Sequence, residues 1–187
     1  MQAAESLTES QRHIKDAGTA LRFGIPAAAL LATFMLEPVR DDADDTGAPW
    51  LMGGTPRHDL ALGIGRAWVV TGVLKYAVNA ERPDGGKHSF PSGHTSMAFA
   101  GAEFIRKEYG WGWGTPALLA AGFVAWSRVE VKRHYTRDVL AGAAIGMLAN
   151  HDFWRRQTRS GTLTLAPGLF ASERTVAPGL RIELELP

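Results

Sequence analysis

The chain has 187 residues, of which 45% are hydrophobic, with a formal net charge of +1 and no cysteine. This length suits one domain with a sizeable core, and the hydrophobic fraction is ordinary for a soluble protein and low for a polytopic membrane protein. The near-neutral charge predicts no nucleic-acid partner. The lack of cysteine excludes disulfides, thiolate metal sites and a cysteine nucleophile, and fits an oxidising compartment as well as a reducing one.

The N-terminal part predicts two helices. Residues 5–20 have amphipathic spacing, with Ser6 and Glu9 placed as in a capping box, and residues 23–36 form an apolar segment. A membrane span needs about 20 mainly apolar residues, which no segment of the chain reaches cleanly, so hydropathy favours buried core helices. The first ten residues lack the basic start and apolar run of a signal peptide, and a mature chain with an added Met would look the same.

Residues 59–83 predict a third helix, which Pro83 would stop. Lys75 and Arg82 are seven residues apart, close to two helical turns, so a helix would project both from one face. Taken alone, this pair is better explained as two exposed basic side chains.

The segment "FPSGH", residues 90–94, predicts a turn followed directly by a helix. Such a turn brings Ser92, Gly93 and His94 to a helix N-terminus, where backbone N–H groups lack partners and the helix dipole favours an anion. Taken alone, a capped helix start is the commoner explanation.

Three further helices are predicted at about residues 92–109, 116–127 and 136–153, the first two separated by "GWGWG". Arg128, His134 and Asp138 fall near the junction of the last two. Asp138 follows His134 by four residues, so on a helix its carboxylate would orient the imidazole and leave the other ring nitrogen free as nucleophile or base. Taken alone, a surface His–Asp pair is the commoner explanation of this spacing.

The last 29 residues have a different pattern. Alternating apolar residues in "TLTL" and "IELEL" predict short strands paired as a hairpin. The predicted fold is therefore an all-α bundle of about six helices, residues 1–158, with the active site at helix ends, followed by a short β-hairpin-like tail, residues 159–187.

Together the three clusters favour phosphate chemistry. Three cations and the donors of a helix start suit a tetrahedral dianion, and two histidines can supply one nucleophile and one acid, in an order that the spacing leaves open. No carboxylate cluster indicates a metal, so the prediction is metal-free phosphoryl transfer with no cofactor. The proposed phosphate ligands are Lys75, Arg82, Ser92, Gly93 and Arg128.

These residues resemble the tripartite signature of the type 2 phosphatidic acid phosphatase (PAP2) superfamily. All eleven signature positions are present in order: Lys75-x6-Arg82-Pro83, Pro91-Ser92-Gly93-His94 and Ser127-Arg128-x5-His134-x3-Asp138. The following "VLAGAAIGML" resembles bacterial lipid-phosphatase-like members. The resemblance implies that His134 attacks phosphorus to form a phosphohistidine, that Asp138 orients it, and that His94 protonates the leaving oxygen and then activates water.

The resemblance implies a phosphatase for a phosphomonoester or pyrophosphate of a lipid-linked substrate, working at a membrane surface of the bacterial envelope and facing the periplasm. One alternative is a soluble broad-specificity acid phosphatase, which the moderate hydrophobicity favours. A vanadate-dependent haloperoxidase would share the phosphate site, but those enzymes are far longer. A non-catalytic phosphate-binding domain would not need both histidines and Asp138.

Overall fold

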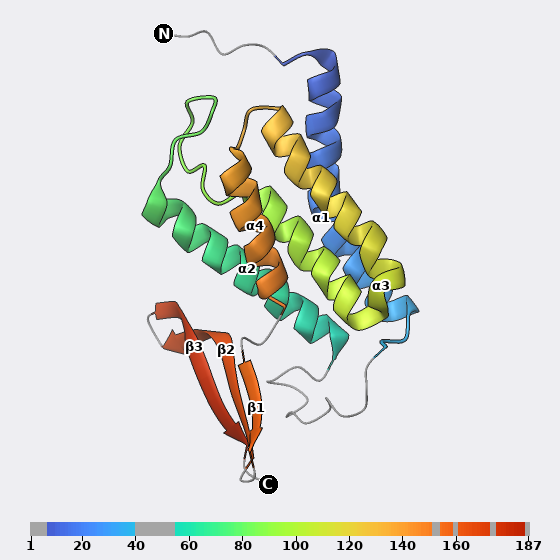
Figure 1. Cartoon of the computed structure of the whole chain (residues 1–187), viewed down its shortest axis with the longest axis vertical. Helices are drawn as coiled ribbons and strands as arrows, with labels where there is room; N and C mark the ends of the chain where they lie inside the picture. Colours follow the sequence, from blue (N-terminus) through green and yellow to red (C-terminus); the bar gives the residue numbers. More distant parts are fainter. Residues whose placement is uncertain (1–6, 40–54, 151–153, 159–160, 173–174, 186–187) are drawn as a thin grey trace.

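The computed structural model describes residues 7–39 and 55–150 with their side chains, and the backbone of three strands beyond them. Its main body is helical, as predicted, but the described residues form four helices rather than about six (Figure 1). Two pairs of predicted helices are each continuous here. The helices are α1 (Glu9–Met35), α2 (Pro56–Val78), α3 (Gly93–Glu130) and α4 (Thr136–Leu148).

Helix α1 runs through both of the segments predicted at residues 5–20 and 23–36, because no helix-breaking residue separates them. It begins one residue after Thr8, whose side chain accepts from the Gln11 backbone N–H while the Gln11 side chain accepts from the Thr8 N–H. This reciprocal pair is a capping box. The cap therefore lies two residues after the Ser6 of the predicted box, and Ser6 itself is outside the described residues.

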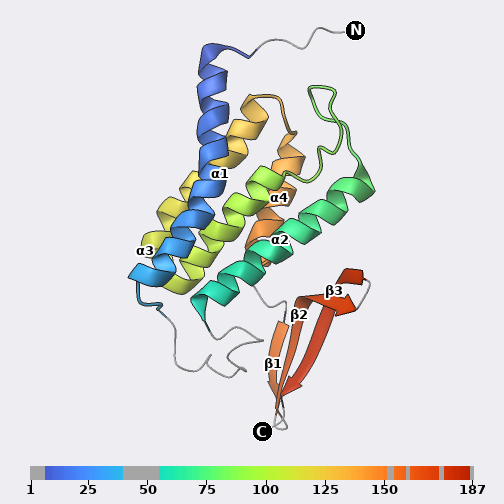
Figure 2. The ribbon, with the colours of Figure 1, turned by 180° about the vertical axis from the view of Figure 1, so that it is seen from behind.

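Helix α3 consists of two segments that meet at Gly110, where φ is 77° and the backbone leaves the helical region. Glycine adopts this conformation without the steric cost that a side chain would add. The two halves fold back and lie side by side (Figures 1 and 2). Their contact is close, because a Cβ built at Gly114 would lie 2.5 Å from the Cβ of Arg106. The predicted break in "GWGWG" is thus confined to one residue.

Helix α4 packs on the first turns of α3 through two glycines. A Cβ at Gly142 would lie 2.6 Å from the Ser92 carbonyl oxygen, and one at Gly146 would collide with the Ser96 carbonyl. Small residues spaced by four let two helix backbones approach this closely. As a result the start of α4 meets the start of α3, where the Ser92 N–H donates to the Asp138 carbonyl at 2.9 Å.

We expect Gly142→Ala to separate α3 from α4. The added methyl group meets backbone rather than a movable side chain, so the expected loss is about 1–3 kcal/mol of unfolding free energy. Gly72→Ala is the matched control, since nothing lies within 4 Å of its Cβ position and alanine favours a helix over glycine. Thermal unfolding of both variants measures the loss of stability. Equal unfolding midpoints for Gly142→Ala and Gly72→Ala would contradict the close approach of α4 to α3 at Gly142.

The bundle has a core of small and medium side chains, while many large apolar side chains face outward. Alanines 98, 102 and 121 are fully buried, whereas exposed hydrophobic residues occur on all four helices, including Leu31, Trp68, Trp111 and Leu140. Helices α1 and α2 are long and apolar enough to cross a membrane, and only 17% of each apolar window is buried in the bundle. The sequence analysis instead favoured buried core helices. Helix α1 differs because it extends beyond the apolar segment considered there, and α2 is a candidate although it carries Arg66 and Lys75.

Residues beyond the bundle form a three-stranded antiparallel sheet in the order β1–β2–β3. In both views the sheet lies beyond α2, away from the α3–α4 connection (Figures 1 and 2). The division of the chain between residues 158 and 159 stays a prediction. The strands are β1 (Trp154–Thr158), β2 (Gly161–Ser172) and β3 (Thr175–Glu185).

Candidate active site

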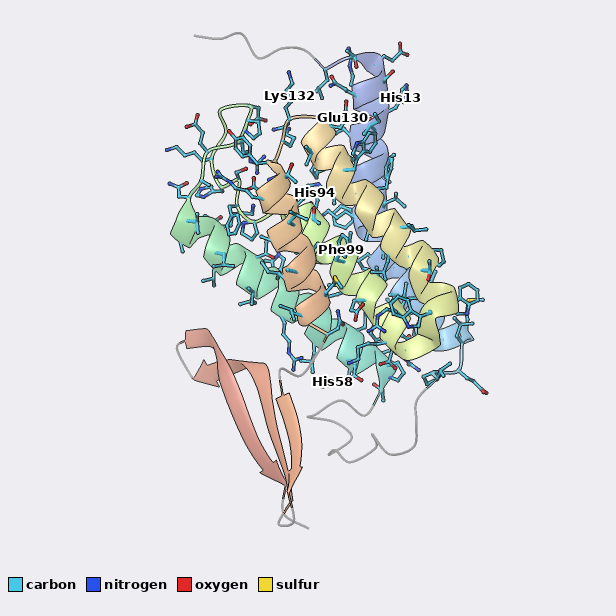
Figure 3. The ribbon with its side chains drawn as sticks, viewed as in Figure 1. His13, His58, His94, Phe99, Glu130 and Lys132 are labelled. Carbon is cyan, nitrogen blue, oxygen red and sulfur yellow. The ribbon has the colours of Figure 1, made fainter. Side chains whose placement is uncertain are left out.

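The signature residues gather at one end of the bundle, where α2 ends, α3 begins and the α3–α4 connection passes. His94 lies inside the bundle toward the end that carries Glu130 and Lys132, whereas His58 lies at the opposite end (Figure 3). The fold therefore brings three separate stretches of chain to one place, although they are up to 63 residues apart between Lys75 and Asp138.

His134 and Asp138 form the buried pair that their spacing predicted. The Nδ1 atom of His134 lies 3.6 Å from Oδ2 of Asp138, and their side chains are 4% and 0% exposed. The predicted reason was wrong, because His134 lies in the connection before α4 rather than on a helix. Asp138 is in the first turn of α4, where its Oδ2 accepts from the Tyr135 N–H at 3.0 Å.

Ser89 joins this pair and was missed by the sequence analysis. Its hydroxyl donates to Oδ2 of Asp138 at 2.5 Å and lies 3.5 Å from Nδ1 of His134. The residue is fully buried. Ser89 thus bridges the carboxylate and the imidazole, and both hold the Nδ1 side of the ring. The sequence places Ser89 in the turn before Phe90 and Pro91, which could have marked it as a residue near the site. That position does not predict its contact with Asp138.

The start of α3 provides backbone donors. Ser92 is its N-cap residue, but no cap hydrogen bond from that side chain is formed in the described structure. The Ser92 N–H is already bonded to Asp138, and its hydroxyl accepts from Thr95 at 3.1 Å. The N–H groups that remain for an anion are those of the first helical turn, beginning at Gly93.

Lys75 and Arg82 reach the site from different elements, not from one helix face as predicted. Helix α2 ends at Val78 because Asn79 adopts a left-handed conformation with φ of 45°. Lys75 is in its last turn and donates to the carbonyls of His88 and Pro91, both at 2.8 Å. Arg82 lies in the following loop, and its Nε is buried without a hydrogen-bond partner.

Arg128 is almost fully buried and is hydrogen-bonded to α1. Its guanidinium donates to the Lys15 carbonyl at 2.7 Å, to the Thr19 hydroxyl at 3.3 Å and to the neighbouring Ser127 hydroxyl at 3.1 Å. Gly18 makes this contact possible, because a Cβ there would lie 2.6 Å from Nη2 of Arg128. Helix α1, which carries no part of the signature, therefore forms one wall of the site.

Arg22 is the second residue that the sequence analysis missed. Its Nη1 lies 3.3 Å from Nε2 of His94. Because a guanidinium cannot act as an acceptor, His94 Nε2 accepts this hydrogen bond and carries no proton in this arrangement. Only the fold places α1 beside His94, 72 residues away in sequence.

Burial and the surrounding cations lower the pKa of both histidines. Burial, followed by Arg22, Arg128, His134 and Arg82, lowers the pKa of His94 from 6.5 to about 3. Burial, followed by Lys75 and Arg82, lowers the pKa of His134 to about 4, although Asp138 and Ser89 oppose this effect. Both imidazoles are therefore neutral near pH 7. A neutral His134 has a ring lone pair for nucleophilic attack.

These pKa values predict acid destabilisation. The unfolded chain takes up protons on both histidines as the pH falls through 6.5, but the folded site resists them down to about pH 4 and 3. The stability is therefore full above pH 6.5 and is lost as the pH falls toward 4. Thermal unfolding between pH 7.5 and 4.5 should show a weaker pH dependence for His94→Gln than for the exposed control His13→Gln. An equal pH dependence of the unfolding midpoint in the two variants would contradict the contribution of His94 to acid destabilisation.

We expect Arg128→Lys to lower kcat/KM by about a hundredfold despite the retained charge. Lysine has no planar fork, so it cannot donate to Lys15, Thr19 and a substrate oxygen together. Steady-state kinetics of Arg128→Lys measure this effect. Arg12→Lys, at an exposed position on α1, is the control and should keep the wild-type kcat/KM. Unchanged kinetics would remove Arg128 from the site.

The described residues include no group of three or more histidine, aspartate or glutamate side chains that could hold a metal ion. What these residues do assemble is a set of cations and helix N–H donors around a buried His–Ser–Asp arrangement. Such a set can bind a phosphate dianion and present one imidazole to it.

The chain belongs to the PAP2 superfamily, which residues 58–160 match. It is similar to the lipid A 1-phosphatase of Porphyromonas gingivalis, with 38% identity over 100 residues that cover 50% of this chain and 22% of that protein. It is also similar to lipid phosphate phosphatase 1 of Arabidopsis thaliana, with 41% identity over 92 residues, or 41% of this chain and 28% of that protein. The chain thus matches less than a third of these relatives' lengths.

Among solved structures, the fold resembles LpxE of Aquifex aeolicus. The TM-score is 0.53 at 21% sequence identity, covering 80% of this chain and 96% of that one. This likeness concerns the fold, and it extends the similarity beyond the matched segment to most of the helical bundle.

Proposed function

We propose that this protein is a metal-independent phosphatase that removes a terminal phosphate from a lipid-linked substrate through a phosphohistidine. The arrangement of His134 carries the proposal. Its Nδ1 side is held by Ser89 and Asp138, while Nε2 makes no hydrogen bond to the described residues and is free to attack phosphorus. The names of the relatives, lipid A 1-phosphatase and lipid phosphate phosphatase, support the substrate class.

In the proposed first step, Nε2 of His134 forms a bond to phosphorus as the bond from phosphorus to the leaving oxygen breaks. The electron pair goes to that oxygen, which receives a proton from His94. A bound dianion offsets the cations that lower the pKa of His94, so substrate binding favours its protonated form. Water then attacks the phosphohistidine, returns a proton to His94 and releases inorganic phosphate.

The phosphoryl oxygens are held by Lys75, Arg82, Arg128 and the N–H groups that begin at Gly93, with the Ser92 hydroxyl beside them. Asp138 is fully buried and acts on His134 rather than on the substrate. It keeps the imidazole oriented and balances the positive charge that develops during attack.

We further propose that the bundle sits in or on a membrane. Large apolar side chains are exposed on all four helices, including Phe34, Trp68, Trp113 and Leu140, which suits an apolar surrounding. The two candidate spans, α1 and α2, are poorly buried by the rest of the bundle. We place the site on the periplasmic face of the cell envelope, and hydrolysis of an impermeant ester by intact cells tests that placement.

Phosphate release in EDTA from a long-chain lipid phosphate and from p-nitrophenyl phosphate tests the activity. Turnover of the lipid substrate in detergent micelles, without added metal, is the expected result. Turnover of the soluble ester alone would favour a soluble acid phosphatase, and vanadate-dependent halide oxidation would favour a haloperoxidase. Phosphate binding with no turnover of either ester would overturn the catalytic proposal.

A further inference from the structure

Arg22 is a cation of the site that the three-part signature does not contain. It is the single charged residue between Asp16 and Glu37, in the apolar part of α1. Within the described part of the chain, its guanidinium bonds to His94 and lies 4.5 Å from the ring centroid of Phe23, and no carboxylate pairs with it. Its Nε is buried without a hydrogen-bond partner. Charged side chains in such apolar segments are costly and are usually retained for function.

Helix α1 places Arg22 beside a proposed phosphate ligand. Gly18 and Thr19 meet the guanidinium of Arg128, and the Thr19 hydroxyl accepts from its Nη1 at 3.3 Å. Residues three and four positions apart lie on one face of a helix, so Arg22 follows them one turn further along the same face. A phosphate group held by Arg128 and the start of α3 therefore has Arg22 as a neighbour, with an Nε–H to donate.

The hydrogen bond from Arg22 is incompatible with a protonated His94. The Nε2 atom of His94 accepts from the guanidinium and so carries no proton. An imidazolium carries a proton on both ring nitrogens and has no acceptor, whichever nitrogen faces the leaving oxygen. The imidazolium that would act as the acid can therefore form only when Arg22 releases Nε2.

The charges around His94 add to this obstacle. After burial, the causes that lower its pKa are, in order, Arg22, Arg128, His134 and Arg82. These four groups face His94 from α1, from the end of α3, from the connection before α4 and from the loop after α2. Arg22 is the first of them and also occupies the accepting atom. An incoming dianion offsets the positive charges and offers Arg22 a different acceptor.

We propose that Arg22 couples substrate binding to the protonation of His94. Before an anion binds, Arg22 holds Nε2 of His94 and keeps the imidazole neutral. When the phosphate group of the substrate arrives, Arg22 donates to a phosphoryl oxygen instead, and Nε2 takes up a proton from solvent. His94 then gives a proton to the leaving oxygen as the bond from that oxygen to phosphorus breaks. The inference rests on the proposed phosphatase function and makes Arg22 a further ligand of the transferred phosphate group.

The test follows the ring nitrogens of His94 by ¹⁵N NMR during a pH titration of histidine-labelled protein, with His94→Gln to assign the signals. Sulfate is the probe, because it is a tetrahedral dianion that takes up no proton near neutral pH. In the wild-type protein we expect saturating sulfate to raise the pKa of His94. The same spectra, recorded at increasing sulfate concentration, give the dissociation constant of sulfate.

Arg22→Met removes the charge and the donor but keeps an unbranched, helix-forming side chain. In this variant we expect a higher His94 pKa without sulfate, a smaller rise when sulfate binds, and sulfate binding that is weaker by about 10- to 100-fold. Arg22→Lys keeps a charge and a donor, so its values should lie between those of Arg22→Met and the wild-type protein. Arg12→Met, at an exposed arginine on the same helix, is the control and should match the wild-type protein.

An equal His94 pKa in Arg22→Met and the wild-type protein without sulfate would overturn the inference, because Arg22 would then not control Nε2. An equal rise in this pKa on sulfate binding, an unchanged sulfate affinity, or no sulfate binding to the wild-type protein would also overturn it. These measurements need no turnover, so they decide about Arg22 even if neither ester is hydrolysed and the phosphatase function fails. Conversely, hydrolysis of the lipid phosphate without any effect of sulfate on the His94 pKa would leave the phosphatase function standing and remove the coupling.

Discussion

Replacing His134 with alanine is expected to lower phosphate release by about 10⁴-fold or more, because the variant lacks the proposed nucleophile and cannot form the proposed phosphohistidine. The side chain is 4% exposed, so its loss also leaves a cavity beside Ser89 and Asp138. Initial rates on the lipid phosphate measure the effect, and thermal unfolding shows whether the variant is folded.

The matched control for this variant is His13→Ala on α1. The His13 side chain is 80% exposed and contacts only Glu9 among the described interactions, so its removal should leave the rate unchanged. Trapping radiolabelled phosphate on the wild-type protein by rapid acid-free denaturation should give a base-stable adduct that His134→Ala lacks. Substantial residual turnover in folded His134→Ala would rule out His134 as the nucleophile.

Asp138→Asn is expected to lower kcat by roughly a thousandfold or more with little change in KM. Asparagine fits the same space, and its amide oxygen can accept from Ser89 and Tyr135 as Oδ2 does. What the variant loses is the negative charge beside His134. Because Asp138 is fully buried and cannot touch the substrate, the effect should appear in the chemical step rather than in binding.

Asp59→Asn provides the control, because Asp59 is in the first turn of α2, next to His58 at the opposite end of the bundle (Figure 3). Its kcat and KM should match those of the wild-type protein. If Asp138→Asn instead raised KM at unchanged kcat, Asp138 would act in binding, and the orienting role would have to be abandoned.

The phosphate chemistry could be predicted from the sequence because the signature residues occur in short local groups. The segment from Pro91 to His94 defines a turn and a helix start by its composition, and the structure begins α3 at Gly93. The contact between His134 and Asp138 was also expected from their spacing. It arises differently, through a connection that brings His134 back to the first turn of α4.

Helix boundaries were predicted less well. Pro83 was expected to end the third helix, but Asn79 ends α2 four residues earlier through its left-handed backbone. Asparagine is among the few residues that adopt this conformation at low cost, yet it does not require it. The tendency of asparagine to adopt this conformation ends the helix only when tertiary contacts fix the following loop. Here Lys75 fixes the loop by donating hydrogen bonds to the carbonyls of His88 and Pro91.

The sequence by itself was enough to predict the family, which the comparison with known families confirms, and to propose phosphate chemistry and the residues for it, because these depend on side-chain types at short, regular spacings. Only the tertiary structure decided which other groups complete the site. Ser89 meets Asp138 across 49 residues and Arg22 meets His94 across 72, contacts that no local pattern encodes. They depend on how closely the helices approach, which Gly18 permits between α1 and α3, and Gly142 between α3 and α4.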